Sequence, residues 1–532
     1  MFDLLIRQGR IIDGTGRRSF VGDVGIQGGV ISEVGCSITG RAERVLDAED
    51  LAVAPGFIDL HSHSDLYVFS DPFAQPKLRQ GVTTEVMGND GLAVAPVGCS
   101  EDEAEAYVRP LLGSMNGPWR WRSLGQYLQC LEESRLAINS CCLAPHNTIR
   151  ACVAGFGSAG LTGNQLEEAK GMVRQCMREG ALGMSTGLLY APGCFSDSKE
   201  LAELAGVVSE FDGVHVSHIR SESDGLRESI DEILQVGLDA KCRTHVSHLK
   251  VSGKRNWGLA IDVLSRLDRA REKGIEVTCD QYPYPAGSTM LSALLPPWAL
   301  QDGMPSLLLR LESDTFRKKV AVSIEEGITG WDNVVGAVGY DNIMVNGVSS
   351  ERNRSCEGQS LGSIARSTGE DPVDVVCRLL VEEGGEVTIV VFQQSDDDLK
   401  NIACYSHAAV ATDGVCSARR PHPRLYGTYP RVLGRFARDR GWFSLEEGVR
   451  KMTSLPASIM GIEGLGRLAP GYKADLVVFD PNTIIDTATF EDPIRTPIGV
   501  ERVIVSGAVV LEEGNLTGAR PGKVLRRGKP AI

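Results

Sequence analysis

The chain has 532 residues, 42% of them hydrophobic, and its formal net charge is −14 with an isoelectric point near 5.3. This length favours one large domain with a smaller one, and the hydrophobic content is sufficient for a packed core. The dispersed acidic charge argues against nucleic acid or an anionic membrane surface as the main partner.

Cysteine usage and the first residues indicate a soluble cytoplasmic protein. The fourteen cysteines include no Cys-x-x-Cys pair, which excludes a zinc ribbon and a disulfide framework and favours reduced thiols. The N-terminal residues, Met-Phe-Asp-Leu-Leu-Ile-Arg, lack the basic and apolar regions of a signal peptide. We find no apolar run long enough to cross a bilayer.

Residues 1–53 consist of short alternating strands, with Asp13-Gly14 and Gly28-Gly29 as turn signals. The same pattern returns after about residue 456, in alternating runs at 474–480 and 502–510. We therefore expect 1–53 and 456–532 to form one small β-sandwich domain that is built from both chain termini.

Between these ends, residues 54–455 alternate strand-like runs with amphipathic helical stretches, as βα units around a parallel sheet do. The eight runs begin at Phe57 and continue at 83–86, 140–143, 182–186, 214–218, 244–248, 277–280 and 409–413. The sequence thus predicts an α/β fold, a TIM-like (β/α)₈ barrel. A Pro-rich stretch at 295–298 and helical residues after it predict an inserted subdomain over about 285–348.

Histidines and carboxylates recur at the ends of these runs. His61 and His63 are separated by one residue, so in a strand both side chains point to the same face. Four further candidates end other runs: Asp90, His218, His248 and Asp413. In a closed barrel these ends meet at one mouth, where imidazoles and carboxylates can hold one or two metal ions with a position left open for water. Singly, each could be an ordinary polar residue at a strand end; together they predict a metal site.

Several motifs carry a resemblance to the amidohydrolase superfamily. They are Gly-Phe-Ile-Asp-Leu-His-Ser-His (56–63), Gly-Val-Thr-Thr (81–84), Met-Gly-Asn (87–89), Ser-His-Leu-Lys (247–250) and Thr-Asp-Gly (412–414). Three others are similar to those of N-acyl-D-amino-acid deacylases (D-aminoacylases): Asp-Gln-Tyr-Pro-Tyr (280–284), Gly-Ser-Thr (287–289) and His-Pro-Arg-Leu-Tyr-Gly-Thr-Tyr-Pro-Arg (422–431). The resemblance runs nearly end to end, including the split β domain and the barrel insertion.

The resemblance implies a role for each strand-end residue. His61 and His63 match the histidines of the weaker metal position, whereas His218 and His248 match those of the tightly held zinc. Asp413 matches the aspartate that activates water as general base and then protonates the leaving amine. Further matches line the substrate site and hold its α-carboxylate: Lys250, Tyr282, Ser288 and Arg424. Independently of the resemblance, an arginine at 424 could bind a carboxylate bidentately.

One ligand position departs from the family pattern. These deacylases carry a cysteine in Gly-Asn-Cys-Gly as a zinc ligand, whereas this chain has Gly-Asn-Asp-Gly, with Asp90 in that place. A carboxylate is a harder ligand than a thiolate and can bridge two ions. The expected cofactor is therefore one or two Zn²⁺ ions, with Mn²⁺ or Co²⁺ possible. A plain turn residue is the alternative for Asp90.

We expect metal-dependent hydrolysis of the amide bond of N-acyl-D-amino acids, in which water activated by the metal attacks the carbonyl. The partner is then a small-molecule substrate, while the oligomeric state stays open. One alternative is a cyclic amidohydrolase that opens a lactam, hydantoin or dihydroorotate-like ring, although the bridging lysine of such enzymes is replaced by Gly-Met-Ser-Thr at 183–186. A non-catalytic barrel scaffold is the other alternative.

Overall fold

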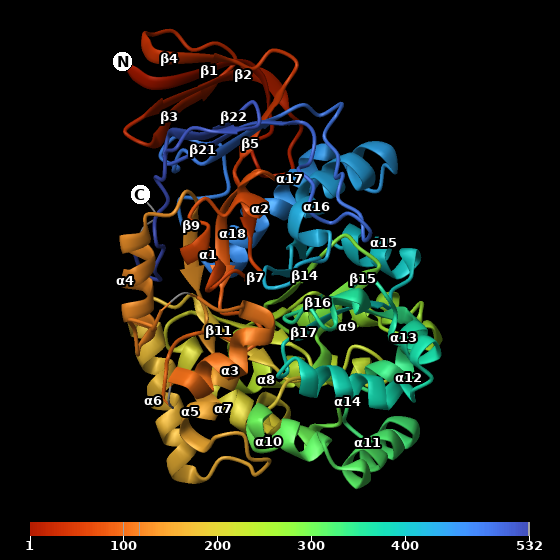
Figure 1. Cartoon of the computed structure of the whole chain (residues 1–532). Coiled ribbons are helices and arrows are strands. Elements are labelled where there is room, and N and C mark those ends of the chain that lie inside the picture. The colour runs from red at the N-terminus through yellow and green to blue at the C-terminus, as the bar shows by residue number, and fades with distance from the viewer. Residues whose placement is uncertain (99–100, 116, 530–532) are drawn as a thin grey trace.

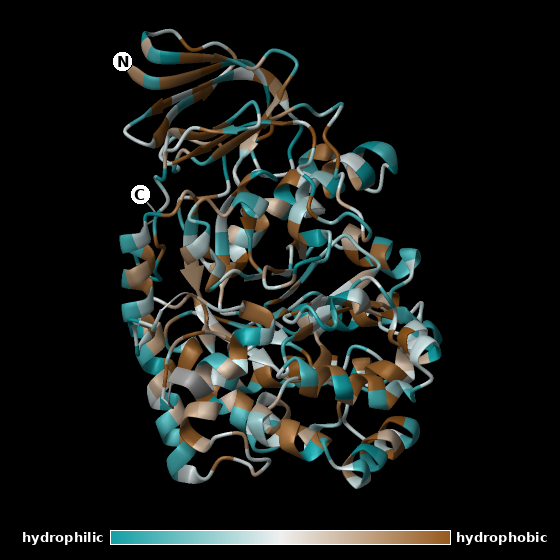
Figure 2. Ribbon diagram, in the orientation of Figure 1, coloured by the Kyte–Doolittle hydropathy of each residue, from teal (hydrophilic) through white to brown (hydrophobic). Residues whose placement is uncertain are grey.

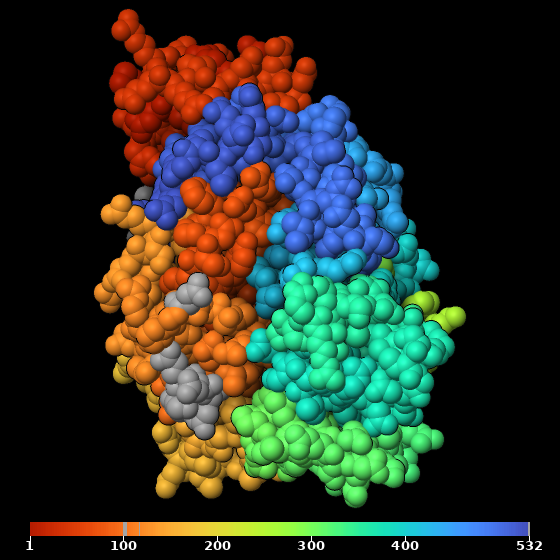
Figure 3. Space-filling view, in the orientation of Figure 1, coloured from red at the N-terminus to blue at the C-terminus, as the bar shows by residue number. Residues whose placement is uncertain are grey.

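The computed structural model describes residues 1–98, 101–115 and 117–529 (Figure 1). A β-sheet from both chain ends lies at the top of Figure 1, above a barrel of parallel strands and helices. Figure 3 shows the C-terminal segment, in blue, between the red N-terminal segment and the first part of the barrel. The last three residues of the predicted C-terminal part, 530–532, lie outside the described residues.

Both chain ends contribute to one nine-stranded sheet. Its N-terminal strands are β1 (Phe2–Ile11), β2 (Phe20–Gln27), β3 (Val30–Gly35), β4 (Ala42–Asp47) and β5 (Ala52–Pro55). Its C-terminal strands are β20 (Leu476–Phe479), β21 (Val500–Val505), β22 (Ala508–Glu512) and β23 (Asn515–Leu516). Antiparallel pairing of β5 with β20 joins the two groups. The prediction that both termini build one small β domain is therefore confirmed.

Short parallel strands form the barrel: β6 (Phe57–Asp59), β7 (Ser62–His63), β8 (Val82–Met87), β9 (Asn139–Cys142), β10 (Ala144–Pro145), β11 (Gly183–Gly187), β12 (Val214–His218), β13 (Arg243–Val246), β14 (Val277–Gln281), β18 (Ala408–Val410) and β19 (Gly414–Val415). We call each strand position of the barrel a stave. Three staves are interrupted and consist of two consecutive strands each: β6 and β7, β9 and β10, and β18 and β19. Pairing runs β6-β8-β9, then β10-β11-β12-β13-β14-β18, and β19 returns to β7. The ring thus has eight staves, and each contains one of the eight predicted runs.

Helices surround these staves: α1 (Tyr67–Ser70), α2 (Gln75–Leu78), α3 (Glu101–Leu112), α4 (Leu124–Ser134), α5 (His146–Ala154), α6 (Gly163–Glu179), α7 (Ser198–Ser209), α8 (Leu226–Ala240), α9 (Ala260–Glu272), α15 (Asp396–Cys404), α16 (Arg424–Arg431), α17 (Leu445–Met452) and α18 (Ser454–Met460). Local sequence fixes their ends; α6, for example, begins with a Thr162–Gln165 capping box and ends at Gly180 in a left-handed conformation. Figure 2 shows hydrophilic residues over much of the outer helices. One buried apolar cluster joins the strands to α18 and includes Ile58, Val86, Val214 and Ala409.

An insertion follows β14. It contains an antiparallel sheet of β15 (Ala286–Met290), β17 (Val387–Phe392) and β16 (Ile343–Val348), in that order. Its helices are α10 (Gly303–Leu311), α11 (Asp314–Glu326), α12 (Val334–Val338), α13 (Leu361–Thr368) and α14 (Pro372–Glu382). The insertion has its own apolar core, which includes Leu307, Ile343 and Ile389. Because β17 pairs with both β15 and β16, we propose that the insertion spans about 285–395 and extends past the expected end at 348.

We found no helix in the described ranges with the length and hydropathy needed to span a bilayer.

Candidate metal centre

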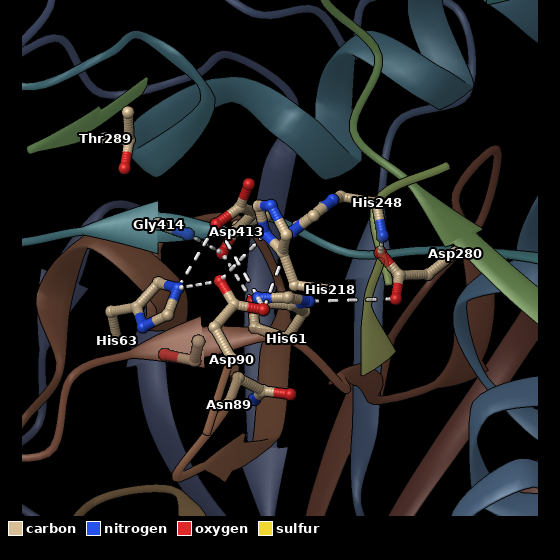
Figure 4. A network of polar contacts seen from close by, with 12 residues as sticks. His61, His63, Asn89, Asp90, His218, His248, Asp280, Thr289, Asp413 and Gly414 are labelled. Carbon is tan, nitrogen blue, oxygen red and sulfur yellow. Dashed lines mark hydrogen bonds and ion pairs between the residues drawn. The ribbon is translucent and has the colours of Figure 1, made fainter. Parts of the chain in front are cut away.

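The six predicted metal ligands meet at the carboxyl ends of the barrel strands. They come from the β6–β7 bend (His61), β7 (His63), the loop after β8 (Asp90), the end of β12 (His218), the turn after β13 (His248) and the break between β18 and β19 (Asp413). All six are buried. Figure 4 shows their polar groups turned toward a common centre.

The ligand atoms fall into two overlapping sets, and within each set all of them lie within 4.8 Å of one another. One set contains His61, His63, Asp90 and Asp413, and the other contains Asp90, His218 and His248. Asp90 belongs to both: Oδ2 lies 3.4 Å from His63 Nε2, and Oδ1 lies 3.5 Å from His248 Nε2. The arrangement can therefore hold one ion or two with Asp90 between them.

A divalent ion fits these residues. Both ring nitrogens of His61 and of His218, Nδ1 of His63 and Oδ1 of Asp90 are buried without a hydrogen-bond partner. Buried polar atoms are nearly always paired, and a cation would supply the missing partner for these nitrogens and the carboxylate oxygen. Imidazole with carboxylate is a donor set that suits zinc.

The charges of the cluster also favour a cation. Burial opposes ionisation of the His61 ring, yet the carboxylates of Asp90 and Asp413 raise its pKa well above the ordinary value. In turn, although burial alone would raise it, the pKa of Asp90 is held well below its usual range by His61 and His248. The carboxylates thus remain ionised, and a metal ion can take the place of protons on the imidazoles.

Three ligands have a backbone conformation that L-residues rarely adopt. The φ angles of Asp90, His248 and Asp413 are +54°, +33° and +47°. Such residues cost on the order of 1 kcal/mol or more each and persist where neighbours fix them. The Asp413 N–H donates to His61 O at 2.9 Å, and the His248 N–H donates to Asp280 Oδ1 at 2.9 Å. These two hydrogen bonds hold the backbone of Asp413 and His248 in the conformation that turns their side chains toward the cluster.

Two further carboxylates lie beside the histidines predicted to bind metal, and neither was among the predicted site residues. Asp280 lies 3.8 Å from His61 Nδ1, and its Oδ2 also contacts His245 Nε2 at 2.8 Å. Glu222 Oε1 lies 3.0 Å from His248 Nδ1, a nitrogen that Lys250 Nζ also approaches at 2.7 Å, while Nε2 faces the cluster. Such partners fix the tautomer and ring orientation of metal-binding histidines. The sequence offered one weak signal, the position of Glu222 four residues after His218.

The four predicted substrate-site residues line the same cavity, of about 40 Å³, as the ligands. Arg424 Nη1 forms an ion pair with Asp413 Oδ2 at 2.8 Å, Nη2 donates to Ser288 O at 3.1 Å, and the guanidinium lies 4.5 Å from the centre of the Tyr282 ring. Apart from Arg424 Nη1, whose contact is the ion pair with Asp413, three buried polar atoms there have no hydrogen-bond partner: Arg424 Nε, Tyr282 OH and Ser288 Oγ. They form a group of donors beside the metal ligands.

Lys250 is placed differently from the other three. Its Nζ contacts the carboxylate of Glu222 and lies 2.7 Å from His248 Nδ1. The ammonium group is therefore already paired within the protein. A substrate carboxylate would have to share it with Glu222.

The fold and this site define a metal-dependent hydrolase barrel. Residues 44–279 and 406–511 match the model of the Amidohydrolase family, and the chain belongs to that family. The unmatched segment between them, 280–405, contains the insertion. The resemblance found in the sequence motifs is thus confirmed.

Relatives match nearly the whole chain. The chain is 34% identical to D-aminoacylase of Alcaligenes xylosoxydans xylosoxydans, over 99% of this chain and 98% of that protein. It is 35% identical to N-acyl-D-glutamate deacylase of the same organism, over 99% of this chain and 96% of that one. A crystal structure of N-acyl-D-glutamate deacylase from Bordetella bronchiseptica, complexed with zinc and a phosphonate mimic of the tetrahedral intermediate, has a TM-score of 0.84 and 34% identity over 99% of each chain. These matches confirm the prediction of a zinc-dependent enzyme that hydrolyses linear amides.

Proposed function

We propose that this protein hydrolyses the amide bond of N-acyl-D-amino acids and releases a carboxylic acid and a D-amino acid. The observation that carries the proposal is one cavity that contains both sets of metal ligands and, beside them, the unpaired donors of Arg424, Tyr282 and Ser288. The named activities of the relatives, D-aminoacylase and N-acyl-D-glutamate deacylase, support a linear N-acyl-D-amino acid as the substrate class.

Asp413 is the general base of the proposed reaction. When bound, a divalent ion supplies Lewis acidity and makes hydroxide available near neutral pH. Asp413 Oδ1 faces the ligands, 3.3 Å from His63 Nε2, while Oδ2 is held by Arg424. Oδ1, the oxygen on the side of the imidazoles, would take the proton of the attacking water and return it to the leaving amine. Burial opposes ionisation of the Asp413 carboxyl group, yet Arg424 and His61 keep its pKa below the usual range, so the group is present as the carboxylate that a base requires.

Arg424, Tyr282 and Ser288 bind the α-carboxylate of the substrate in this proposal. A carboxylate accepts several hydrogen bonds, and Arg424 Nε, Tyr282 OH and Ser288 Oγ are donors without another partner. Lys250 adds positive charge next to them, shared with Glu222. Binding at these groups positions the amide carbonyl toward the metal ligands.

A cyclic substrate remains the second candidate of the same family, but the site favours a linear one. The bridging lysine expected for a ring-opening enzyme is missing at 183–186, and the residue shared by both ligand sets here is Asp90. A non-catalytic scaffold is disfavoured because neither ligand set has lost a member.

A substrate screen tests the proposal. Purified protein is stripped with a chelator, reloaded with Zn²⁺, Mn²⁺ or Co²⁺, and assayed on matched N-acyl D- and L-amino acids, with hydantoins and dihydropyrimidines as cyclic comparisons. We expect turnover of linear D-substrates after metal loading and none before it. Preferential opening of the rings, or turnover that ignores chelation and metal, would overturn the proposal.

We also propose that the protein works in the cytoplasm. The described cysteines form no disulfide, and most of them are buried, which is typical of a reducing compartment. Fractionation of cells that express the tagged protein is the direct measurement.

A further inference from the structure

One acidic side chain of the insertion reaches the barrel beside the metal centre. Asp332 lies in the loop between α11 and α12, and it is only 3% exposed. It lines the same cavity as His218, His248 and Glu222. Neither the sequence motifs nor the proposed chemistry assigns it a role.

Asp332 binds the barrel loop that follows β12. Its Oδ2 accepts the backbone N–H of Glu222 at 3.0 Å, and its Oδ1 accepts the hydroxyl of Ser221 at 2.9 Å and that of Ser223. These donors belong to three consecutive residues, so one carboxylate holds the whole turn. Burial raises the pKa of Asp332, while these hydrogen bonds stabilise its ionised form. No cation is among the described ion-pair partners of Asp332, so the ionised form of its carboxylate depends on the hydrogen bonds from this turn.

The residue in the middle of that turn contacts the metal site. Glu222 Oε1 lies 3.0 Å from His248 Nδ1 and 4.0 Å from His218 Nε2, and it also binds Lys250 Nζ. The opposite nitrogens of these two rings, His248 Nε2 and His218 Nδ1, are the ones that face Asp90. Rotation of the Glu222 backbone would therefore release the orientation of both histidines of one ligand set.

We propose that Asp332 is a positioning residue that fixes the backbone of Glu222, so that Glu222 orients His248 and Lys250 for the metal and the substrate. Docking of the insertion is thereby coupled to the geometry of the metal centre. The flanking residues support this placement: Trp331 and Asn333 line an outer cleft of about 880 Å³ between the insertion and the same barrel loop, whereas Asp332 lines the inner cavity. Asp332 thus lies where the two parts of the chain meet, between cleft and metal centre.

Zinc affinity is the main measurement, because it is independent of the substrate and so distinguishes a failure of this inference from a failure of the proposed function. Removal of partners that orient metal-binding histidines typically costs about 10–100-fold in metal affinity or activity. We expect Asp332→Ala to weaken zinc binding of the stripped protein by about 10–100-fold, measured by competition with a chromophoric chelator. Asp332→Asn keeps an acceptor oxygen for the Glu222 N–H and should stay close to wild type.

The matched control is Asp341→Ala. Asp341 belongs to the same insertion but is exposed and pairs with Arg366 on the surface at 2.8 Å. It should leave zinc affinity, kcat and KM unchanged. If Asp332→Ala fails to fold, Asp332→Ser takes its place with the same expected result, because its shorter side chain cannot reach the Glu222 amide.

Two results would overturn the inference. One is zinc affinity in the folded Asp332 variant equal to that of Asp341→Ala. The other comes from a double-mutant cycle: if Asp332 acts through Glu222, its replacement should add little in a Glu222→Ala background. An undiminished loss there would show that Asp332 acts by another route.

Discussion

Replacement of Asp413 by asparagine tests the role of the proposed base while the other groups of the site are left unchanged. The substitution keeps the size of the side chain but removes the carboxylate that lies 3.3 Å from His63 Nε2 and 2.8 Å from Arg424 Nη1. General acid–base catalysis typically contributes about 10²–10⁴-fold to the rate. At about 1.36 kcal/mol per factor of ten, we expect Asp413→Asn to raise the activation free energy of the hydrolysis by about 3–5 kcal/mol.

The assay is steady-state release of the amino acid from the best substrate of the screen, with saturating zinc. Arg424 keeps its hydrogen bond to Ser288 O and its contact with the Tyr282 ring, so the subsite should survive and KM should change less than kcat. Bound zinc and the unfolding temperature are measured on the same sample, because the loss of a partner for buried Arg424 also lowers stability.

Asp439→Asn is the matched control, since Asp439 is an exposed aspartate whose ion pair with Arg438 lies outside the site. It should retain wild-type kinetics. If Asp413→Asn, with zinc bound, kept kcat within a factor of ten of wild type, another group would be the base and the assignment would be wrong.

Four other outcomes follow from the structure. Removal of the metal should abolish turnover, and reloading zinc to 100 times its Kd should raise the free energy of unfolding by about 2.7 kcal/mol in a thermal or denaturant titration. Arg424→Lys removes the planar fork over Tyr282 and should raise KM at least about tenfold, the effect of losing about 1.4 kcal/mol of binding. Lys77→Met breaks the buried ion pair with Asp59, at 2.5 Å, and should destabilise the fold by about 3–5 kcal/mol in chemical denaturation. Burial lowers the pKa of Lys451 to about 8, so the folded state binds fewer protons than the unfolded chain above that pH; stability from this group should rise from pH 8 toward 10, and Lys451→Met should remove that rise.

The strands and the meeting of the strand-end residues could be predicted because both depend on local patterns. Each apolar run forms one stave, and the polar residue at its end lies at the barrel mouth whatever the loops do. The separation of His61 and Asp413 in sequence is no obstacle, since β7 and β19 are neighbours in the closed ring. A resemblance to known motifs supplied the roles.

The contacts around the ligands could not be predicted in the same way. Glu222 reaches His248 only because its loop folds back over the barrel mouth, and Asp332 lies 110 residues farther along the chain. The pairing of Lys250 with Glu222 likewise depends on that loop. The later end that we propose for the insertion has a different origin, since the apolar run that forms β17 pairs with β15 and β16 rather than with strands of the barrel.

Asp90 shows why the departure from the family pattern is compatible with the site. Its two oxygens each face one imidazole of each ligand set: Oδ1 faces His61 at 3.4 Å and His248 at 3.5 Å, and Oδ2 faces His63 at 3.4 Å and His218 at 3.8 Å. A thiolate at this position offers a single atom that both sets must share, whereas a carboxylate offers two. The carboxylate is also the harder ligand, and with it neither set lacks a donor at this position.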